Sequence, residues 1–89
     1  MQQKICSVDV ICVCSTEGGI RPLRFRATDE QDQKLCVNID EVLRTDEIKA
    51  MGREQQIFLC RATVDGKKWL FELKFSIRAH RWYLLGRYY

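Results

Sequence analysis

Residues 57–85 read IFLCRATV (57–64), DG (65–66), KKWLFELKFSI (67–77), RAH (78–80) and RWYLL (81–85). Apolar side chains occupy every second position of the middle run: Trp69, Phe71, Leu73, Phe75 and Ile77. The positions between them are polar or charged, apart from Leu70. This period of two predicts a strand with one buried face.

The Asp65-Gly66 pair predicts a tight hairpin, because a two-residue type I′ turn needs positive φ at both central positions and these residues tolerate it. Such a turn pairs Val64 with Lys67. It therefore sets Ala62 opposite Trp69, Cys60 opposite Phe71 and Phe58 opposite Leu73, all on the core face. A slip by one residue would bury Arg61 and Lys68, so the turn and the alternation favour the same register.

Three further strands are predicted before this hairpin. The first, over 8–15, is mostly apolar on both parities, which is typical of a strand covered on both sides or of one near the middle of a barrel. A turn at 16–19 leads to a strand over 20–27, with Leu23, Phe25 and Ala27 inward and Pro22, Arg24 and Arg26 outward. Proline cannot donate to a ladder, so Pro22 indicates an edge or a bulge. The third strand covers 34–39.

Residues 40–54 break the alternation. The apolar positions there follow neither a strand period nor a long helical stripe, and Gly52 could end a helix. We predict a turn or short helix over 46–51, capped by Thr45 and inserted between strands. The final strand is expected over 82–85, followed by a frayed tail over 86–89.

These elements predict a mainly β fold in a single domain over residues 1–89. The expected architecture is a small antiparallel, SH3-like barrel or roll of about six strands, with one short helix or turn insertion. The alternative is an open meander backed by the 40–54 segment.

Four strings resemble a group of small uncharacterised bacterial β-domain proteins: Val8-Asp-Val-Ile, Ile20-Arg-Pro-Leu-Arg-Phe-Arg26, Phe71-Glu-Leu-Lys-Phe75 and Arg81-Trp-Tyr-Leu84. The resemblance covers most of residues 8–85. It implies a stand-alone β-domain and transfers no activity and no site residue.

Composition indicates a globular chain, with 46% hydrophobic and 30% charged residues among 89. No apolar run reaches the roughly 18 residues of a membrane span, and the N-terminus lacks the apolar core of a secretory signal. Five cysteines, an odd number, lie mostly in apolar runs and indicate reduced packing thiols. We therefore expect a cytoplasmic protein.

No catalytic residue, metal ligand or cofactor is predicted. Cys12 and Cys14 would project from one face of a strand about 6 to 7 Å apart, too far for a disulfide and useful to a metal only if other ligands converge. His80 lies in a bend without a partner that would make it a general base.

Two sets of side chains are candidates for binding. Ile57, Leu59 and Leu70 place carbon on the outer face of the central hairpin, where they either lie under the 40–54 segment or meet another chain. Arg24, Arg26, Lys68 and Lys74 face outward and could contact single-stranded nucleic acid. We expect a non-enzymatic interaction module acting through a protein partner or self-association, with nucleic-acid binding through a basic surface as the alternative.

Overall fold

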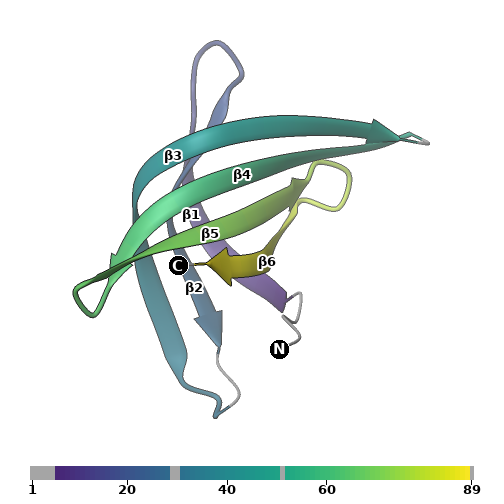
Figure 1. Cartoon of the computed structure of the whole chain (residues 1–89). Coiled ribbons are helices and arrows are strands. Elements are labelled where there is room, and N and C mark those ends of the chain that lie inside the picture. Colours follow the sequence, from purple (N-terminus) through teal and green to yellow (C-terminus); the bar gives the residue numbers. More distant parts are fainter. Residues whose placement is uncertain (1–5, 29–30, 51, 89) are drawn as a thin grey trace.

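The fold is a closed antiparallel barrel of six strands joined in simple chain order, β1-β2-β3-β4-β5-β6 (Figure 1). This computed structural model describes residues 6–28, 31–50 and 52–88. The strands are β1 (Cys6–Cys14), β2 (Ile20–Thr28), β3 (Lys34–Ala50), β4 (Arg53–Val64), β5 (Lys67–Ser76) and β6 (Arg81–Tyr88). The prediction of a small mainly β barrel is confirmed.

The β4–β5 hairpin has the predicted register. Val64 pairs with Lys67, Cys60 with Phe71 and Phe58 with Leu73. Asp65 and Gly66 have φ values of 51° and 77°, both in the left-handed region that a type I′ turn needs. Phe58, Cys60 and Leu73 are fully buried, so the predicted core face is correct.

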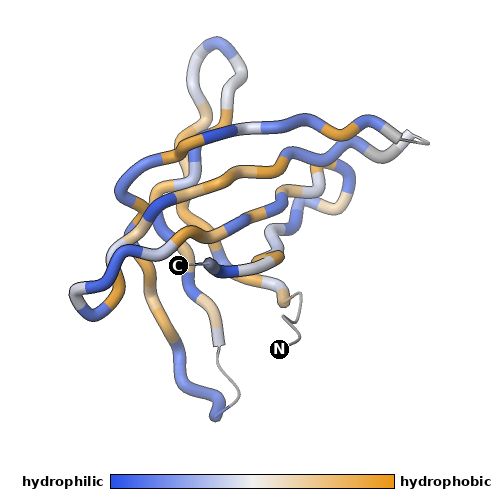
Figure 2. Tube along the Cα trace, in the orientation of Figure 1, coloured by the Kyte–Doolittle hydropathy of each residue, from blue (hydrophilic) through white to orange (hydrophobic). Residues whose placement is uncertain are grey.

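Two groups of aromatic side chains fill the barrel. Phe25 on β2 meets Phe71 on β5 edge to face, with ring centroids 5.2 Å apart. Trp82 packs between Phe58 and Phe75, with centroid distances of 5.4 and 4.9 Å. Hydrophobic positions accordingly concentrate where the strands cross the barrel, and the turns between them are mostly hydrophilic (Figure 2).

The predicted helix or turn over 46–51, capped by Thr45, is wrong. Strand β3 continues through this segment to Ala50 and pairs with β4 along the whole distance, while Met51 lies outside the described residues. Two register shifts, at Asp40 and Leu43, explain the error. Each β-bulge inserts one residue and resets which parity faces inward, so a continuous strand loses its period of two in the sequence.

The bulges also bend β3, which pairs with β2 along its first part and with β4 along the rest. Residues 34–38 pair with β2, whereas residues from Ile39 onward pair with β4. Beyond the barrel wall, β3 and β4 run on together as a projecting hairpin (Figure 1). Gly52, with φ of 75°, lies in the turn at its tip instead of ending a helix.

A bulge in β2 corrects a second prediction. Ile11 pairs with Arg24 but Cys12 pairs with Pro22, so Leu23 is the inserted residue. Pro22 is consequently buried and Leu23 is 38% exposed, the reverse of the predicted orientation. The expectation that Pro22 marks a bulge is confirmed.

Two smaller corrections concern the ends of the sheet. Of the two alternatives for β1, cover on both sides is wrong, since Ile11 is 60% and Val13 40% exposed. The expected frayed tail is a strand as far as Tyr88, which pairs with Leu70. Leu85 is an inserted residue, a β-bulge, and the pairing of β5 with β6 continues on both sides of it.

The core can be tested at Phe71, which is 3% exposed and contacts Phe25. We expect Phe71→Ala to lower the free energy of unfolding by about 3 to 5 kcal/mol, because it leaves a cavity between the two halves of the barrel. Lys68→Ala, on the outward parity of the same strand, should change it by less than about 0.5 kcal/mol. Urea unfolding measures both, and equal losses would contradict the assignment of faces.

Candidate functional site

The outer sheet face comprises Ile57 and Leu59 on β4, Leu70 on β5, and Tyr83 and Tyr88 on β6. Ile57, Leu59 and Leu70 lie on the outward parity, as predicted. Leu70 pairs with Tyr88, and Lys74 pairs with both Ile57 and Tyr83, so residues of three neighbouring strands share this surface. The three aliphatic side chains are half-buried and Tyr88 is 44% exposed.

No described element covers the outer sheet face. The 40–54 segment was expected to lie over it, but this segment is part of β3 and β4 within the same sheet. The prediction of a cover was therefore wrong. Among the described residues, the neighbours of the side chains on this face are those of the same sheet, such as Arg61 opposite Leu70 and Glu72 opposite Leu59.

Two ion pairs and a cation–π contact lie at the outer sheet face. Arg44 Nε lies 2.9 Å from Asp46 Oδ2, and Arg61 Nη1 lies 3.5 Å from Glu41 Oε2. Lys74 Nζ lies 5.0 Å from the centre of the Tyr83 ring, a cation–π geometry. An apolar centre with a polar, internally paired rim is the usual composition of a protein-binding surface.

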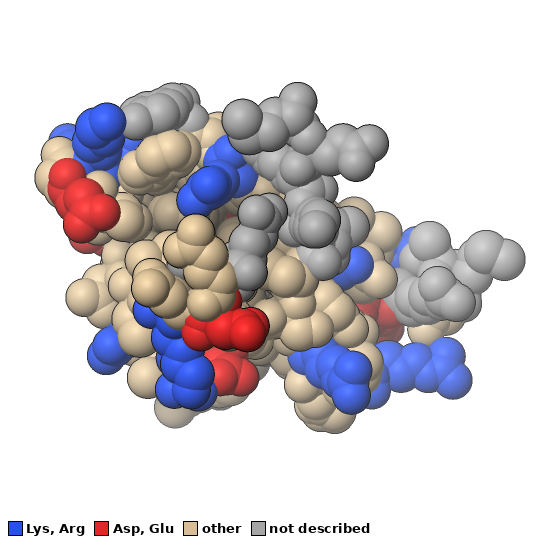
Figure 3. Space-filling model, turned by 90° about the horizontal axis from the view of Figure 1, so that it is seen from below, with Lys and Arg blue, Asp and Glu red and all other residues tan. Residues whose placement is uncertain are grey.

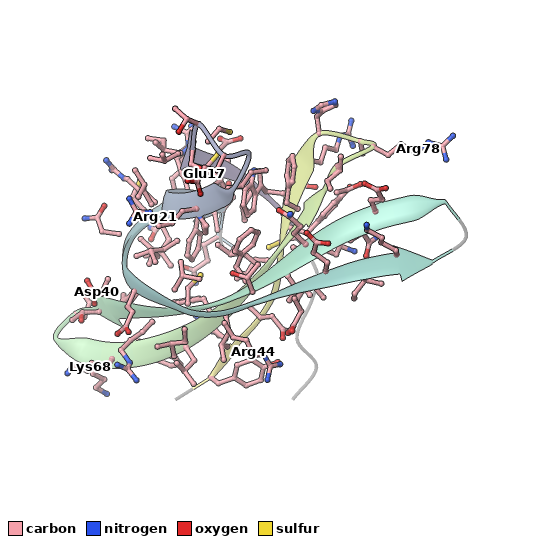
Figure 4. All side chains as sticks on the ribbon, turned by 90° about the horizontal axis from the view of Figure 1, so that it is seen from above. Glu17, Arg21, Asp40, Arg44, Lys68 and Arg78 are labelled. Carbon is pink, nitrogen blue, oxygen red and sulfur yellow. The ribbon has the colours of Figure 1, made fainter. Side chains whose placement is uncertain are left out.

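The four nucleic-acid candidates do not share a surface. Arg24 and Arg26 point outward from β2, whereas Lys68 and Lys74 point outward from β5, on the opposite side of the six-stranded barrel. Lys68 and Lys74 are themselves six residues apart along β5, roughly 20 Å. Figure 4 shows Arg44 and Lys68 along one side of the molecule, with Arg21 and Arg78 apart from them and from each other.

Arg26 is also engaged in an ion pair. Its Nη2 donates to Asp9 Oδ2 at 2.6 Å, and this hydrogen bond and the charge of Asp9 raise the pKa of the guanidinium. On the face seen from below, Lys and Arg are interspersed with Asp and Glu among uncharged side chains (Figure 3). The described residues seen on this face do not form the continuous cationic track that a single strand would follow (Figure 3).

The cysteines are placed as separate thiols. Cys12 is half-buried and Cys14 is exposed, and burial, followed by the neighbouring Cys14 thiol, raises the pKa of Cys12. Cys60 lies in the core, where burial raises its pKa to about 11. Within residues 6–28, 31–50 and 52–88, no group of three or more His, Cys, Asp or Glu side chains is arranged to hold a metal ion. The same residues contain no helix long and apolar enough to cross a membrane.

Sequence reasoning missed three exposed apolar residues on the other side of the barrel: Ile11, Val13 and Leu23. The exposure of Ile11 and Val13 could not be predicted, because both parities of β1 are mostly apolar and the alternation does not show which one faces outward. Leu23 was misplaced because the bulge beside Pro22 reverses the parity. The proline itself was the signal, since a non-donor inside a paired strand requires a local break in the ladder.

The raised pKa of Cys60 predicts a pH dependence. The folded state keeps this thiol protonated up to about pH 11, whereas the unfolded thiol ionises from its ordinary value of 9.0. The stabilisation is thus complete below pH 9 and is lost as pH rises toward 11.

Urea unfolding across this range should therefore show a steeper loss of stability for the parent than for Cys60→Ala. Cys36→Ala removes an exposed thiol and should keep the parental slope. Identical slopes for the parent and Cys60→Ala would contradict the burial of this thiol.

The structure thus places the predicted Ile57, Leu59 and Leu70 on one open face, which also includes Tyr83 and Tyr88. It separates the four predicted nucleic-acid residues into two pairs on opposite sides of the barrel, Arg24 with Arg26 and Lys68 with Lys74. No protein-family model, curated protein or solved structure matches the chain.

Proposed function

We propose that this protein is a non-enzymatic interaction module whose outer sheet face binds a protein surface, either a partner or a second copy of the chain. The observation that carries the proposal is that Ile57, Leu59 and Leu70 form an apolar group on a sheet face that no described element covers. Full burial of an exposed aliphatic side chain contributes roughly 1.5 to 3 kcal/mol, and these half-buried side chains gain a fraction of that on association.

The paired charges around the face support the same proposal. Arg44 is bound to Asp46 and Arg61 to Glu41 within the protein, so a partner does not need to supply counter-charges for these two arginines. Association through this face should consequently depend little on salt, because screening acts on charges and not on apolar burial.

The cytoplasmic location, the bacterial resemblance and the SH3-like character of the barrel remain predictions. They are compatible with a small barrel that acts through its outer surface.

Leu70→Glu tests the proposal. It places a carboxylate within the apolar group, beside Arg61, on a position that does not enter the core. We expect the variant to keep the parental thermal stability within a few degrees and to weaken association at least tenfold, because the carboxylate would be desolvated at the interface. Sedimentation velocity measures self-association, and capture from lysate of the source cell measures partner binding.

Lys68→Glu is the control, since it also places a carboxylate on the outward parity of β5, outside the apolar group, and changes the net charge even more than Leu70→Glu does. It should associate like the parent. A monomeric parent that captures the same proteins as Leu70→Glu would contradict the proposal.

Nucleic-acid binding is the alternative, and one observation favours it. Arg24 faces outward from β2 and, among the described residues, makes no ion pair, unlike its neighbour Arg26. If single strands bind there, affinity should fall with salt by a log-log slope of roughly −0.7 per phosphate neutralised.

Fluorescence polarisation of a labelled oligonucleotide at low and high salt measures this slope. Arg24→Glu/Arg26→Glu should abolish that binding, whereas Lys68→Glu/Lys74→Glu, on the other side of the barrel, should leave it within about twofold. A salt-independent signal, or equal losses in the two double variants, would contradict a binding surface on β2.

A further inference from the structure

The barrel is closed by a short pairing that leaves most of one edge of β1 open. Strand β6 pairs with β1 only at Cys6, Ser7 and Val8. Strand β1 then continues to Cys14, paired with β2 on its other side. Among the described residues, no strand lies along the β6 side of β1 from Asp9 to Cys14. Backbone groups that point to this side can accept an added strand.

The other open edges are protected in recognisable ways. The free edge of β3 from Asp40 onward is densely charged and contains two bulges. The free edge of β2 at its beginning contains Pro22, which has no N–H, and the bulge at Leu23. Charges, bulges and proline are the common means by which proteins prevent strands from adding to an edge.

The β1 edge has none of these protections beyond Asp9. Residues 10–14 read VICVC and are regularly paired, because the bulge beside them lies on β2. Ile11 and Val13, on the outward parity, are 60% and 40% exposed. An exposed apolar edge of this kind binds extended peptides through main-chain hydrogen bonds and side-chain contacts on alternate positions.

A hollow lies where β1 and β6 separate. Its lining consists of residues 7–10 on β1 together with His80, Arg81 and Trp82. Arg81 is exposed and, within the described residues, makes no ion pair, whereas the nearby Asp9 carboxylate is already bound by Arg26. The hollow therefore has an apolar floor at Trp82 and an available positive charge.

Both neighbours of β1 run antiparallel to it, so an antiparallel peptide is the addition that continues the pattern of this sheet. Strand β6 is antiparallel to β1 and begins at Arg81, next to the Val8–Trp82 pair. A peptide that extends the sheet beside residues 9–14 in the same direction as β6 runs from Cys14 toward Asp9. Its carboxyl end therefore arrives at the hollow, beside His80 and Arg81.

We propose that the β1 edge from Asp9 to Cys14 accepts the extended C-terminal segment of another protein by strand addition, with its terminal carboxylate beside Arg81 and His80. A charge-assisted hydrogen bond from Arg81 favours a free carboxylate at this position. This site is separate from the outer sheet face and does not depend on the function proposed for it.

A labelled heptapeptide of alternating threonine and valine, with a free carboxyl terminus, is the first probe. We expect fluorescence polarisation to show saturable binding. The same peptide as its C-terminal amide should bind at least tenfold more weakly, because a hydrogen bond to a charged group is lost. Arg81→Ala should cause a loss of similar size, whereas Arg78→Ala, which removes an exposed arginine of the same turn, should stay within twofold.

Ile11→Lys tests the edge itself. Lysine at an exposed edge position opposes strand addition, so we expect at least tenfold weaker peptide binding with an unchanged circular dichroism spectrum. Leu70→Glu should bind the peptide like the parent, which separates this site from the outer sheet face.

Three outcomes would overturn the proposal. The first is the absence of peptide binding up to millimolar concentration in the folded parent. The second is equal affinity for the acid and the amide. The third is a dimeric parent that Ile11→Lys converts to a monomer, because the occupant of the edge would then be a second copy of the chain.

Discussion

The edge-to-face contact between Phe25 and Phe71 holds the two sides of this barrel together. The two rings come from β2 and β5, which do not pair, and their centroids are 5.2 Å apart in the interior. Phe25 is 1% exposed and Phe71 3% exposed, so nearly all of their apolar surface is removed from water. A small domain has few residues with which to build a core, and large aromatic side chains contribute much of the available area. Both rings must therefore face inward.

That requirement explains the bulges. Strand β2 keeps Phe25 and Ala27 inward next to β3, and the inserted Leu23 also buries Pro22 nearer the turn. Strand β3 bends at Asp40 and Leu43, so that one continuous strand borders both β2 and β4. A sheet of six strands cannot close tightly without such local increases in twist. After the barrel has closed, two parts of its surface have no further described element beside them. They are the outer sheet face and the edge of β1 from Asp9 to Cys14.

The sequence was most informative where two local signals agreed. At β4 and β5 the Asp65-Gly66 turn and the period of two specify the same register, so the inward set and the outward Ile57, Leu59 and Leu70 could all be predicted. Bulges defeat this reasoning, because one inserted residue reverses the parity that follows. Leu23 and the 40–50 segment were misjudged for that reason.

The separation of Arg24 and Arg26 from Lys68 and Lys74 depends on the order of the strands around the barrel. The periodicity of the sequence carries no information about that order.

The two proposed surfaces recognise partners by different physical means. On the outer sheet face β4 and β5 are paired on both sides, so recognition there depends on the shape and apolar area of side chains such as Leu70. Along β1 the backbone itself is available, so affinity comes from main-chain hydrogen bonds that any extended sequence can make. Selectivity at that edge must then come from its end, where Arg81 distinguishes a terminal carboxylate from a continuing chain. Because the β1–β6 pairing stops at Val8, the proposed peptide edge of β1 ends next to Arg81. The backbone edge alone would select little between sequences, and Arg81 adds a charged group at its end.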